Sequence, residues 1–260
     1  MISNSDAPCI REHSRKISVR AREVECAVLG HGSPLIVLES GLGDDLTSWN
    51  SVFGELSKRA CTLAYSRAGL GASTPAASPR DVTTEAQELW ELLQVLGEPP
   101  PFILVGHSWG GLIVQALAAS LRDKIGGIVL VDPAHPDLID RLHRDTPADA
   151  EEFDRLAAEV YGAAAQEELK ALGAPAGGHF AGEERPYPGP MLILAAWMFS
   201  FNQSHSFLLH HRQRAEEIAG RYPQAELRRI YCAHQIQRER PLAIVDAVDE
   251  VLARSAKARS

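Results

Sequence analysis

Short runs of apolar residues recur along the chain and alternate with longer segments whose apolar residues have helical spacing. The runs predict strands at about 34–38, 61–66, 101–106, 126–131, 190–196 and 225–232, preceded by a strand pair within 16–29. The helical spacing predicts helices at about 48–59, 81–97, 110–122, 203–221 and 241–254, the second with Asp81 as its N-cap. Strands that are apolar throughout are covered on both faces. The pattern therefore predicts an α/β fold, a mostly parallel sheet with helices on both faces.

One interval, 136–188, interrupts this alternation. It contains no strand-like run, only polar helical sequence such as 150–160 and then a Gly/Pro-rich stretch from Gly173 to Pro190. A long surface loop is one interpretation, but structureless loops of that length are uncommon in compact domains. We therefore expect 136–188 to form a helical cap over the strand ends, inserted between the two parts of the core, 1–135 and 189–260.

Length and charge narrow the function classes. A chain of 260 residues suits one α/β domain with an insert. The net charge of −8, with basic residues interspersed among acidic ones, argues against a nucleic-acid surface. No apolar run approaches the roughly 18 residues of a membrane span, and the first residues show no signal-peptide pattern. We expect a cytoplasmic protein, monomer or homodimer, that acts on a small molecule.

The four cysteines, Cys9, Cys26, Cys61 and Cys232, lie far apart and show no C-x-x-C spacing. This spacing indicates neither a zinc site nor a disulfide framework and favours buried free thiols. No Gly-rich phosphate loop and no cluster of metal-ligand residues stands out, so the sequence implies no cofactor and no metal.

The most specific motif is the G-x-S-x-G segment at 106–110, which follows an apolar strand and precedes an apolar helix. A strand that reverses sharply into a helix brings the backbone close around Ser108, so side chains at Gly106 and Gly110 would collide. Such a turn exposes the serine hydroxyl at the sheet edge. The context predicts that Ser108 is a nucleophile and that the backbone amide of Trp109, at the start of the helix, stabilises an oxyanion.

With these elements in order, the chain resembles the α/β-hydrolase family from about residue 16 to 254. The segment 39–43 (Glu-Ser-Gly-Leu-Gly) looks like the family's oxyanion loop, and 65–73 is similar to its D-R-x-G-x-G-x-S segment, with Ser66 in place of Asp. The segment 232–241 resembles the G-H-x-x-x-x-x-x-P run that carries the catalytic histidine, although Ala233 replaces its glycine.

The resemblance implies partners for Ser108, because a serine hydroxyl needs a base and a group that orients that base. His234 follows the last predicted strand and precedes the last helix, which is the position of the family's base. By analogy with the oxyanion loop, the backbone of Leu42 supplies the second oxyanion donor. The other histidines, His211 among them, are expected to be solvated or to line the pocket.

The group that orients the base is an acid in this family, and the sequence indicates it less clearly. The commonest family position, after the strand at 190–196, holds no carboxylate. Asp132 follows the strand after the nucleophile, where some family members carry the acid, and it is our prediction. The alternatives are that Asp132 only caps the strand end, that Asp137 is the acid, or that Ser108 and His234 form a dyad helped by Asn202.

A serine at the elbow excludes the aspartate-dependent chemistry of epoxide hydrolases and haloalkane dehalogenases of this fold. It indicates acyl transfer through an acyl-enzyme. Aromatic and other large residues gather near the strand ends and predict either an apolar acyl pocket or simply core packing: Trp109, Trp197, Met198, Phe199, Phe201 and Phe207. We assign Gly41, His107, His135, Trp197 and Phe201 to the substrate pocket.

The resulting hypothesis is a serine hydrolase of a small, largely apolar ester, lactone or thioester. An acyltransferase or thioesterase acting on a carrier- or CoA-bound acyl group stays open, because a basic rim from Arg141, Arg144, Arg155 and Arg185 would suit it. A non-catalytic ligand-binding protein and a hydrolase of C–C bonds in diketones are further alternatives.

Overall fold

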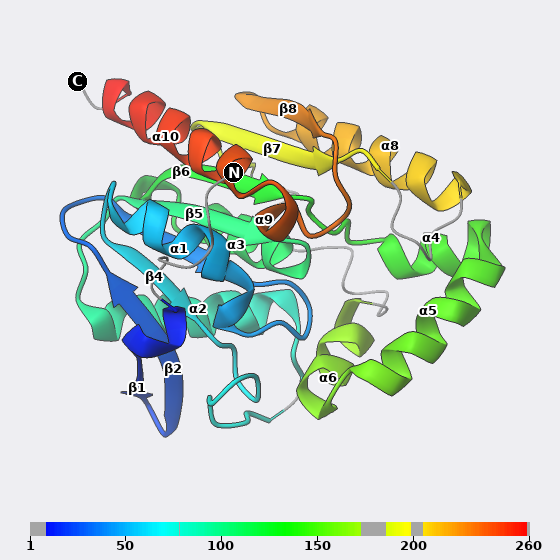
Figure 1. Cartoon of the computed structure of the whole chain (residues 1–260), viewed down its shortest axis with the longest axis horizontal. Coiled ribbons are helices and arrows are strands. Elements are labelled where there is room, and N and C mark those ends of the chain that lie inside the picture. Colours follow the sequence, from blue (N-terminus) through cyan, green and yellow to red (C-terminus); the bar gives the residue numbers. More distant parts are fainter. Residues whose placement is uncertain (1–8, 78, 173–185, 199–204, 259–260) are drawn as a thin grey trace.

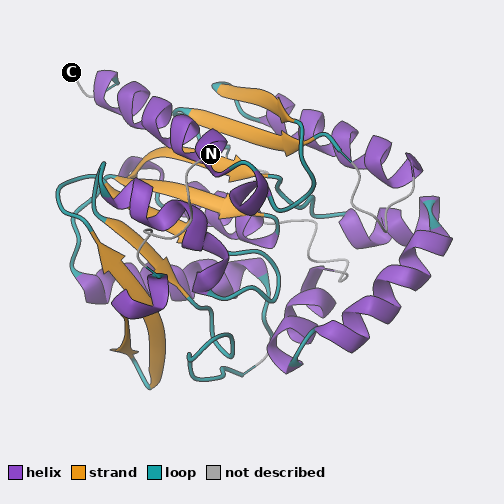
Figure 2. Ribbon diagram, viewed as in Figure 1, coloured by secondary structure: helices purple, strands orange, loops and turns teal. Residues whose placement is uncertain are grey.

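The computed structural model describes residues 9–77, 79–172, 186–198 and 205–258, without the side chains of 205–210. These residues form an eight-stranded sheet with helices on both faces (Figures 1 and 2). The strands are β1 (Ser14–Val19), β2 (Arg22–Leu29), β3 (Leu35–Glu39), β4 (Thr62–Tyr65), β5 (Phe102–His107), β6 (Ile125–Val131), β7 (Met191–Ala196) and β8 (Ala225–Ile230).

The helices of the core are α1 (Asn50–Ser57), α2 (Val82–Leu96), α3 (Trp109–Ser120), α8 (His205–Arg221), α9 (Ile236–Glu239) and α10 (Pro241–Lys257). Short 3₁₀ turns lie at Ile10–His13, Leu46–Trp49 and Arg122–Lys124. Asp81 accepts a hydrogen bond from the Thr84 amide at 2.8 Å, so its predicted role as the N-cap of α2 is confirmed.

The strand order is β1-β2-β4-β3-β5-β6-β7-β8. The pairs β1/β2 and β2/β4 are antiparallel, and every later pair is parallel. This arrangement confirms the predicted mostly parallel sheet. Because the carboxyl ends of the parallel strands lie at one edge, the residues that follow β5, β6 and β7 are brought together there.

Successive side chains of the central strands enter two separate cores, as the period of a strand requires. In β3, Leu35 and Val37 belong to the core that also contains residues of α2, α3 and α8, whereas Ile36 and Leu38 belong to the core that contains residues of α1 and α10. All five residues of β3 are buried. The apolar runs in the sequence therefore reflect strands covered on both faces, and the rigid sheet fixes the positions of the loops at its edge.

Between β6 and β7 the chain forms helices α4 (Leu138–Asp145), α5 (Pro147–Val160) and α6 (Ala163–Leu172). They lie beside the carboxyl ends of the strands, on the right in Figure 1. The carboxylate of Glu168, on α6, accepts hydrogen bonds from Nε of Arg67 at 2.8 Å and from the amide of Gly43 at 2.9 Å. These buried contacts attach the insert to two loops of the core.

Two further sequence expectations concern thiols and the membrane. Cys26, Cys61 and Cys232 are buried free thiols, but Cys9 is exposed, so the expectation of burial is wrong for Cys9, which precedes the first 3₁₀ turn at the molecular surface. In the described part of the chain, no helix is both long and apolar enough to span a bilayer.

Candidate active site

Ser108 occupies a strained turn between β5 and α3. Its φ of 50° and ψ of −116° lie in a region that L-residues rarely adopt. Its carbonyl accepts hydrogen bonds from the amides of Gly111 at 2.9 Å and Ala134 at 3.0 Å, so the turn is held from its own helix and from the loop after β6. Surrounding structure therefore stabilises a conformation that the residue would not favour alone.

The two glycines of the elbow are required by steric contact. A Cβ on Gly106 would lie 2.5 Å from the carbonyl oxygen of Gly110, and a Cβ on Gly110 would lie 2.4 Å from that of Glu39. Both distances are below any normal carbon–oxygen contact, and both partners are backbone atoms that cannot rotate away. The collision predicted from the sequence is thus a property of the folded turn.

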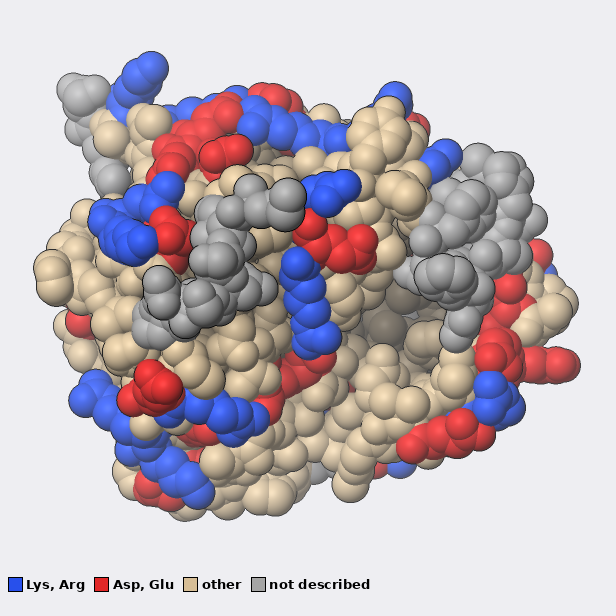
Figure 3. All heavy atoms as spheres, viewed as in Figure 1, with Lys and Arg blue, Asp and Glu red and all other residues tan. Residues whose placement is uncertain are grey.

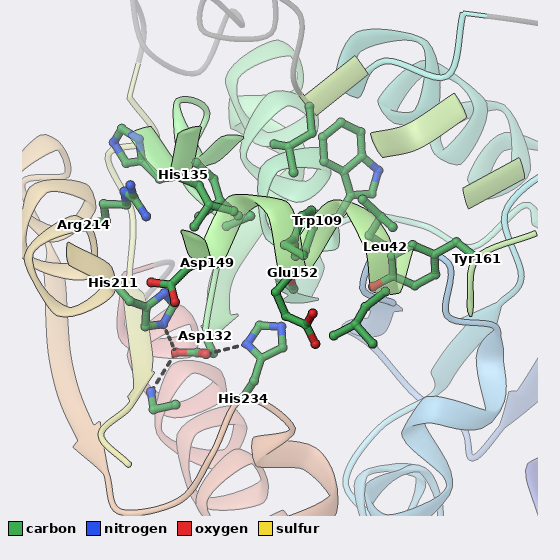
Figure 4. A pocket seen from close by; sticks show the side chains of 18 of the residues that line it. Leu42, Trp109, Asp132, His135, Asp149, Glu152, Tyr161, His211, Arg214 and His234 are labelled. Carbon is green, nitrogen blue, oxygen red and sulfur yellow. Dashed lines mark hydrogen bonds and ion pairs between the residues drawn. The ribbon is translucent and has the colours of Figure 1, made fainter. Parts of the chain in front are cut away.

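Asp132 and His234 meet at the carboxyl edge of the sheet. The carboxylate follows β6 and the imidazole follows β8, and Nδ1 of His234 donates to Oδ2 of Asp132 at 2.6 Å (Figure 4). Because a carboxylate only accepts, Nδ1 carries a proton, and in the neutral form of the ring Nε2 then has the lone pair. Ser108, Asp132 and His234 all line one cavity.

The other oxygen of Asp132 is also occupied. Oδ1 accepts hydrogen bonds from the Ala196 amide at 2.7 Å and from Nε2 of His211, on α8, at 2.8 Å. Burial by itself raises the pKa of Asp132, but the positive charge and hydrogen bonds of His211 and His234 more than offset burial and hold this pKa well below its ordinary value. The carboxylate is therefore ionised at neutral pH and bound by two histidines.

Sequence reasoning missed this role of His211, which we had placed among solvated or pocket-lining residues. The side chain does line the cavity, and it also contacts the acid. Burial lowers its pKa, but the Asp132 carboxylate has the larger combined effect, so the pKa of His211 lies above its ordinary value. No local motif marks such a residue, because the contact joins a helix to a strand end 79 positions earlier.

His107 packs against His234, the candidate catalytic histidine. Its ring centroid is 4.6 Å from that of His234, and its Nε2 donates to the His234 carbonyl at 3.1 Å. Burial, followed by the nearby His234, lowers the pKa of His107 to about 3, so the ring is neutral. Its Nδ1 lies 2.8 Å from where a Cβ on Gly41 would be, so Gly41 leaves room for this ring. Neither His107 nor Gly41, which we assigned to the pocket, is among the described residues that line the cavity, and His107 instead contacts the backbone of His234.

The predicted oxyanion donors, Leu42 and Trp109, both line the cavity beside Ser108. Trp109 is the first residue of α3, so its backbone N–H has no acceptor within that helix. Its indole Nε1 donates to Glu85 at 2.7 Å, which fixes the ring. Leu42 lies in the loop after β3, next to Gly43, whose amide is bound by Glu168.

The cavity has a volume of about 270 Å³, which fits a small molecule. Much of its apolar wall comes from the insert, through Leu138, Leu142, Phe153, Leu156, Tyr161 and Leu172. His135 also lines it. The space-filling view shows a hollow between the insert and the core, and on that face acidic and basic side chains are intermixed (Figure 3).

Several other candidates lie elsewhere. Trp197 is not among the described residues around the cavity, and its ring instead packs against the guanidinium groups of Arg212 at 4.2 Å and Arg229 at 4.5 Å. Asp137 binds His135 and Arg141 rather than His234. Phe201 and Asn202 lie outside the described residues.

The family assignment comes from comparison with known proteins. The family model of the alpha/beta hydrolase fold matches residues 34–231, which include most of the sheet, the elbow and the insert. The chain belongs to the alpha/beta hydrolase family. The described residues hold no group of three or more His, Cys, Asp or Glu side chains arranged to bind a metal ion.

Curated family relatives match only part of the chain. Uncharacterized protein YqjL of Bacillus subtilis is 32% identical over 105 residues, which are 40% of this chain and 42% of that protein. Epoxide hydrolase 3 of Xenopus tropicalis is 30% identical over 106 residues, 40% of this chain and 29% of that one. The matched segments thus span less than half the length of either relative.

Solved structures of the fold align over nearly the whole chain. An enol-lactonase from Burkholderia xenovorans has a TM-score of 0.69 at 20% identity and covers 92% of this chain and 100% of its own. A thermophilic esterase from Thermogutta terrifontis has a TM-score of 0.63 at 23% identity, covering 93% and 98%. At these identities the likeness establishes the alpha/beta hydrolase fold alone.

Proposed function

We propose that the chain is a serine hydrolase that cleaves an ester, lactone or thioester of a small, largely apolar substrate. Ser108 is the nucleophile, His234 the general base and Asp132 the acid that orients it. The observation that carries this proposal is the 2.6 Å hydrogen bond from Nδ1 of His234 to Asp132, with both residues on the cavity that Ser108 lines.

The proton path follows from the tautomer. Nε2 of His234 takes the proton of the Ser108 hydroxyl as the oxygen attacks the substrate carbonyl, and the resulting imidazolium faces the Asp132 carboxylate. His234 then gives that proton to the leaving alcohol or thiol, and the acyl group stays on Ser108. Water, deprotonated by His234, attacks the acyl-enzyme and releases the acid and free Ser108.

The backbone amides of Leu42 and Trp109 are the proposed oxyanion donors in both tetrahedral intermediates. Trp109 opens α3, so its amide and the positive end of the helix dipole are directed at the elbow. Both donors belong to the backbone, which leaves their side chains to shape the cavity. The apolar wall that the insert supplies, for example Phe153 and Leu156, suits an apolar acyl or alcohol group.

The alternative function, an acyltransferase or thioesterase acting on a carrier- or CoA-bound acyl group, has less support. The arginines that would form its basic rim are paired with carboxylates. Arg141 pairs with Asp137 and Glu217, Arg144 with Asp145, and Arg155 with Glu152 and Glu159. Arg185 lies outside the described residues. The three described cationic side chains of this rim are therefore held by carboxylates of the insert and α8.

The test is hydrolysis of p-nitrophenyl esters of increasing acyl length, with fluorophosphonate labelling followed by intact mass. Wild type should turn over and take one label, and Ser108→Ala should lose both. Asp132→Asn should lower kcat by about 10³–10⁴-fold, because the amide favours the wrong histidine tautomer. Asp137→Asn, a carboxylate near the site that does not touch His234, is the matched control. A folded wild type with neither turnover nor label would overturn the proposal.

A further inference from the structure

Arg214, on α8, is a buried cation at the same cavity as Ser108 and His234 (Figure 4). Its side chain is 4% exposed, and its Nε has no hydrogen-bond partner. Within the described part of the chain, its guanidinium donates no hydrogen bond to any acceptor. Buried guanidinium groups are normally bound by carboxylates or carbonyls, so this one has unused donors facing a cavity.

The carboxylate of Asp137, which lies beside Arg214, does not accept a hydrogen bond from its guanidinium. Oδ1 of Asp137 lies 3.7 Å from Nε of Arg214, outside hydrogen-bond range. That same oxygen already binds Nδ1 of His135, and the other oxygen of Asp137 binds Nε of Arg141. Arg141 also forms an ion pair with the neighbouring Glu217, at 3.4 Å. The local acceptors are thus engaged by other donors.

The chemistry of the unused donors selects the ligand. A planar guanidinium binds a carboxylate through two parallel N–H donors, which gives direction as well as affinity. Burial lowers the pKa of Arg214 and Asp137 only partly opposes this, yet an arginine remains protonated at neutral pH. An unpaired charge in a place shielded from water interacts more strongly with an incoming anion than a surface charge does.

We propose that Arg214 is a subsite for a carboxylate of the substrate, so the preferred substrate is an ester or lactone that carries a free carboxylate away from the scissile carbonyl. This inference rests on the proposed function and names its substrate class. The apolar residues of the wall, such as Leu138 and Phe153, contact the carbon chain between the two polar ends.

Two acidic residues of α5 also line the cavity, and they restrict where the anion binds. The carboxylate of Glu152 is held by two nitrogens of Arg155, at 2.8 and 2.9 Å. Asp149 has interactions of its own as well. Both are already partnered anions that repel a second one, so the substrate carboxylate is confined to the Arg214 side of the cavity.

The experiment compares matched substrate pairs with the intact protein. In one pair the carboxylate is in the acyl part, p-nitrophenyl glutarate hemiester against p-nitrophenyl hexanoate. In the other it is in the alcohol part, the butyryl ester of glycolic acid against that of glycolamide. Wild type should prefer the charged member of at least one pair by about tenfold or more in kcat/KM, the range of a hydrogen bond to a charged group.

Variants separate a subsite from a general effect on the protein. Arg214→Met should abolish the preference for the charged ester, and Arg214→Lys should keep part of it. Arg212→Gln is the matched control, because Arg212 carries the same charge on the same helix but donates to the Trp197 carbonyl and does not line the described cavity. Its preference should equal that of wild type. An equal loss on both members of a pair in Arg214→Met would overturn the subsite.

A measurement on wild type alone covers the case in which Arg214 variants do not fold. Pentanoate should inhibit hydrolysis of the neutral ester competitively, about tenfold more strongly than pentanamide, which has the same carbon chain but no charge. Equal inhibition by pentanoate and pentanamide, or a preference for neutral substrates in both pairs, would overturn the subsite while leaving the hydrolase proposal intact. Absence of turnover on every ester together with absence of fluorophosphonate labelling would instead overturn the proposed function itself.

Discussion

His211 donates from Nε2 to Oδ1 of Asp132 at 2.8 Å, while the same carboxylate accepts from His234 through its other oxygen. The candidate acid therefore lies between two histidines that come from different elements, α8 and the loop after β8. The ring of His211 stands edge-on to that of His234, with 6.4 Å between centroids. His211 thus acts on His234 through the carboxylate that they share, so we regard it as a positioning residue.

Removing the His211 donor should lower activity and shift its pH dependence. In His211→Leu, Oδ1 keeps only the Ala196 amide, so the carboxylate charge is less compensated and the base it faces stays protonated to higher pH. We expect kcat/KM to fall about tenfold and its acid limb to move upward in pH. His211→Gln, which retains a donor, should recover part of both.

The expected shift of the pH profile depends on several charges that act on the pKa of His211. Asp132 favours its charged form, and Arg212 and Arg214 on the same helix disfavour it. His143→Gln, an exposed histidine of the insert, is the control and should leave the pH profile in place. An unchanged acid limb in His211→Leu, with activity lost at all pH values alike, would show that the residue only maintains the fold.

The buried neutral ring of His107 should make the protein sensitive to acid. Its pKa is about 3 in the folded state against an ordinary 6.5, so the unfolded chain binds the extra proton first as pH falls. Stability should therefore decline between about pH 6.5 and 3, by about 1.4 kcal/mol per pH unit from this residue at most.

Urea unfolding at a series of pH values tests the assignment to His107. His107→Gln cannot titrate, so its free energy of unfolding should fall less steeply over the same window than that of wild type. The difference between the two proteins isolates His107 from the buried carboxyls, such as Glu39 and Glu85, whose raised pKa values act with the opposite sign. Parallel slopes for both proteins would contradict the low pKa.

A methyl group on Gly110 should damage the elbow. The added Cβ would meet the carbonyl oxygens of Glu39 at 2.4 Å and Ser40 at 2.5 Å, so β3 or α3 must shift. We expect Gly110→Ala to lose about 2 kcal/mol or more in stability and most of its activity. Gly220→Ala is the control, because its new Cβ would have no described heavy atom within 4 Å apart from its chain neighbours and its own helix backbone, and urea midpoints give the comparison.

Glu168 should hold the insert against the core. Its buried carboxylate binds Arg67 through two nitrogens, at 2.8 and 3.0 Å, and also accepts from Gly43. Glu168→Ala leaves Nε of Arg67 and the Gly43 amide without their acceptor, at a cost of about 1–3 kcal/mol per unsatisfied group, while Arg67 keeps its ion pair with Glu39 at 2.8 Å. We expect faster proteolysis within 138–172 and a raised KM.

The control for this effect is an acidic residue of the insert that faces solvent. Glu159→Gln removes a carboxylate that is 59% exposed and pairs only with its helical neighbour Arg155 among described contacts. It should leave proteolysis and KM close to wild type, since exposed pairs contribute little. If Glu168→Ala were cleaved no faster than Glu159→Gln, the insert would be held by its apolar contacts.

The sequence by itself determined the features that repeat or that act over a few residues. Buried strands are apolar throughout because both faces are covered, so β3, β5, β6 and β7 are visible as runs of consecutive apolar residues. The elbow is equally local, since Gly106 and Gly110 are needed within one turn. The family's segments likewise placed Ser108 and His234 at strand ends.

Only the tertiary structure decided which distant side chains meet. His234 and Asp132 are 102 positions apart, and His211 and Asp132 are 79 apart, and no periodicity marks a pairing of strand ends or of a helix with a strand end. The same holds for Arg214, which on a helical wheel is one more polar residue of α8. Its burial and its unused donors depend on how α8 packs beside a cavity that the insert also lines, and long-range packing of this kind leaves no local pattern.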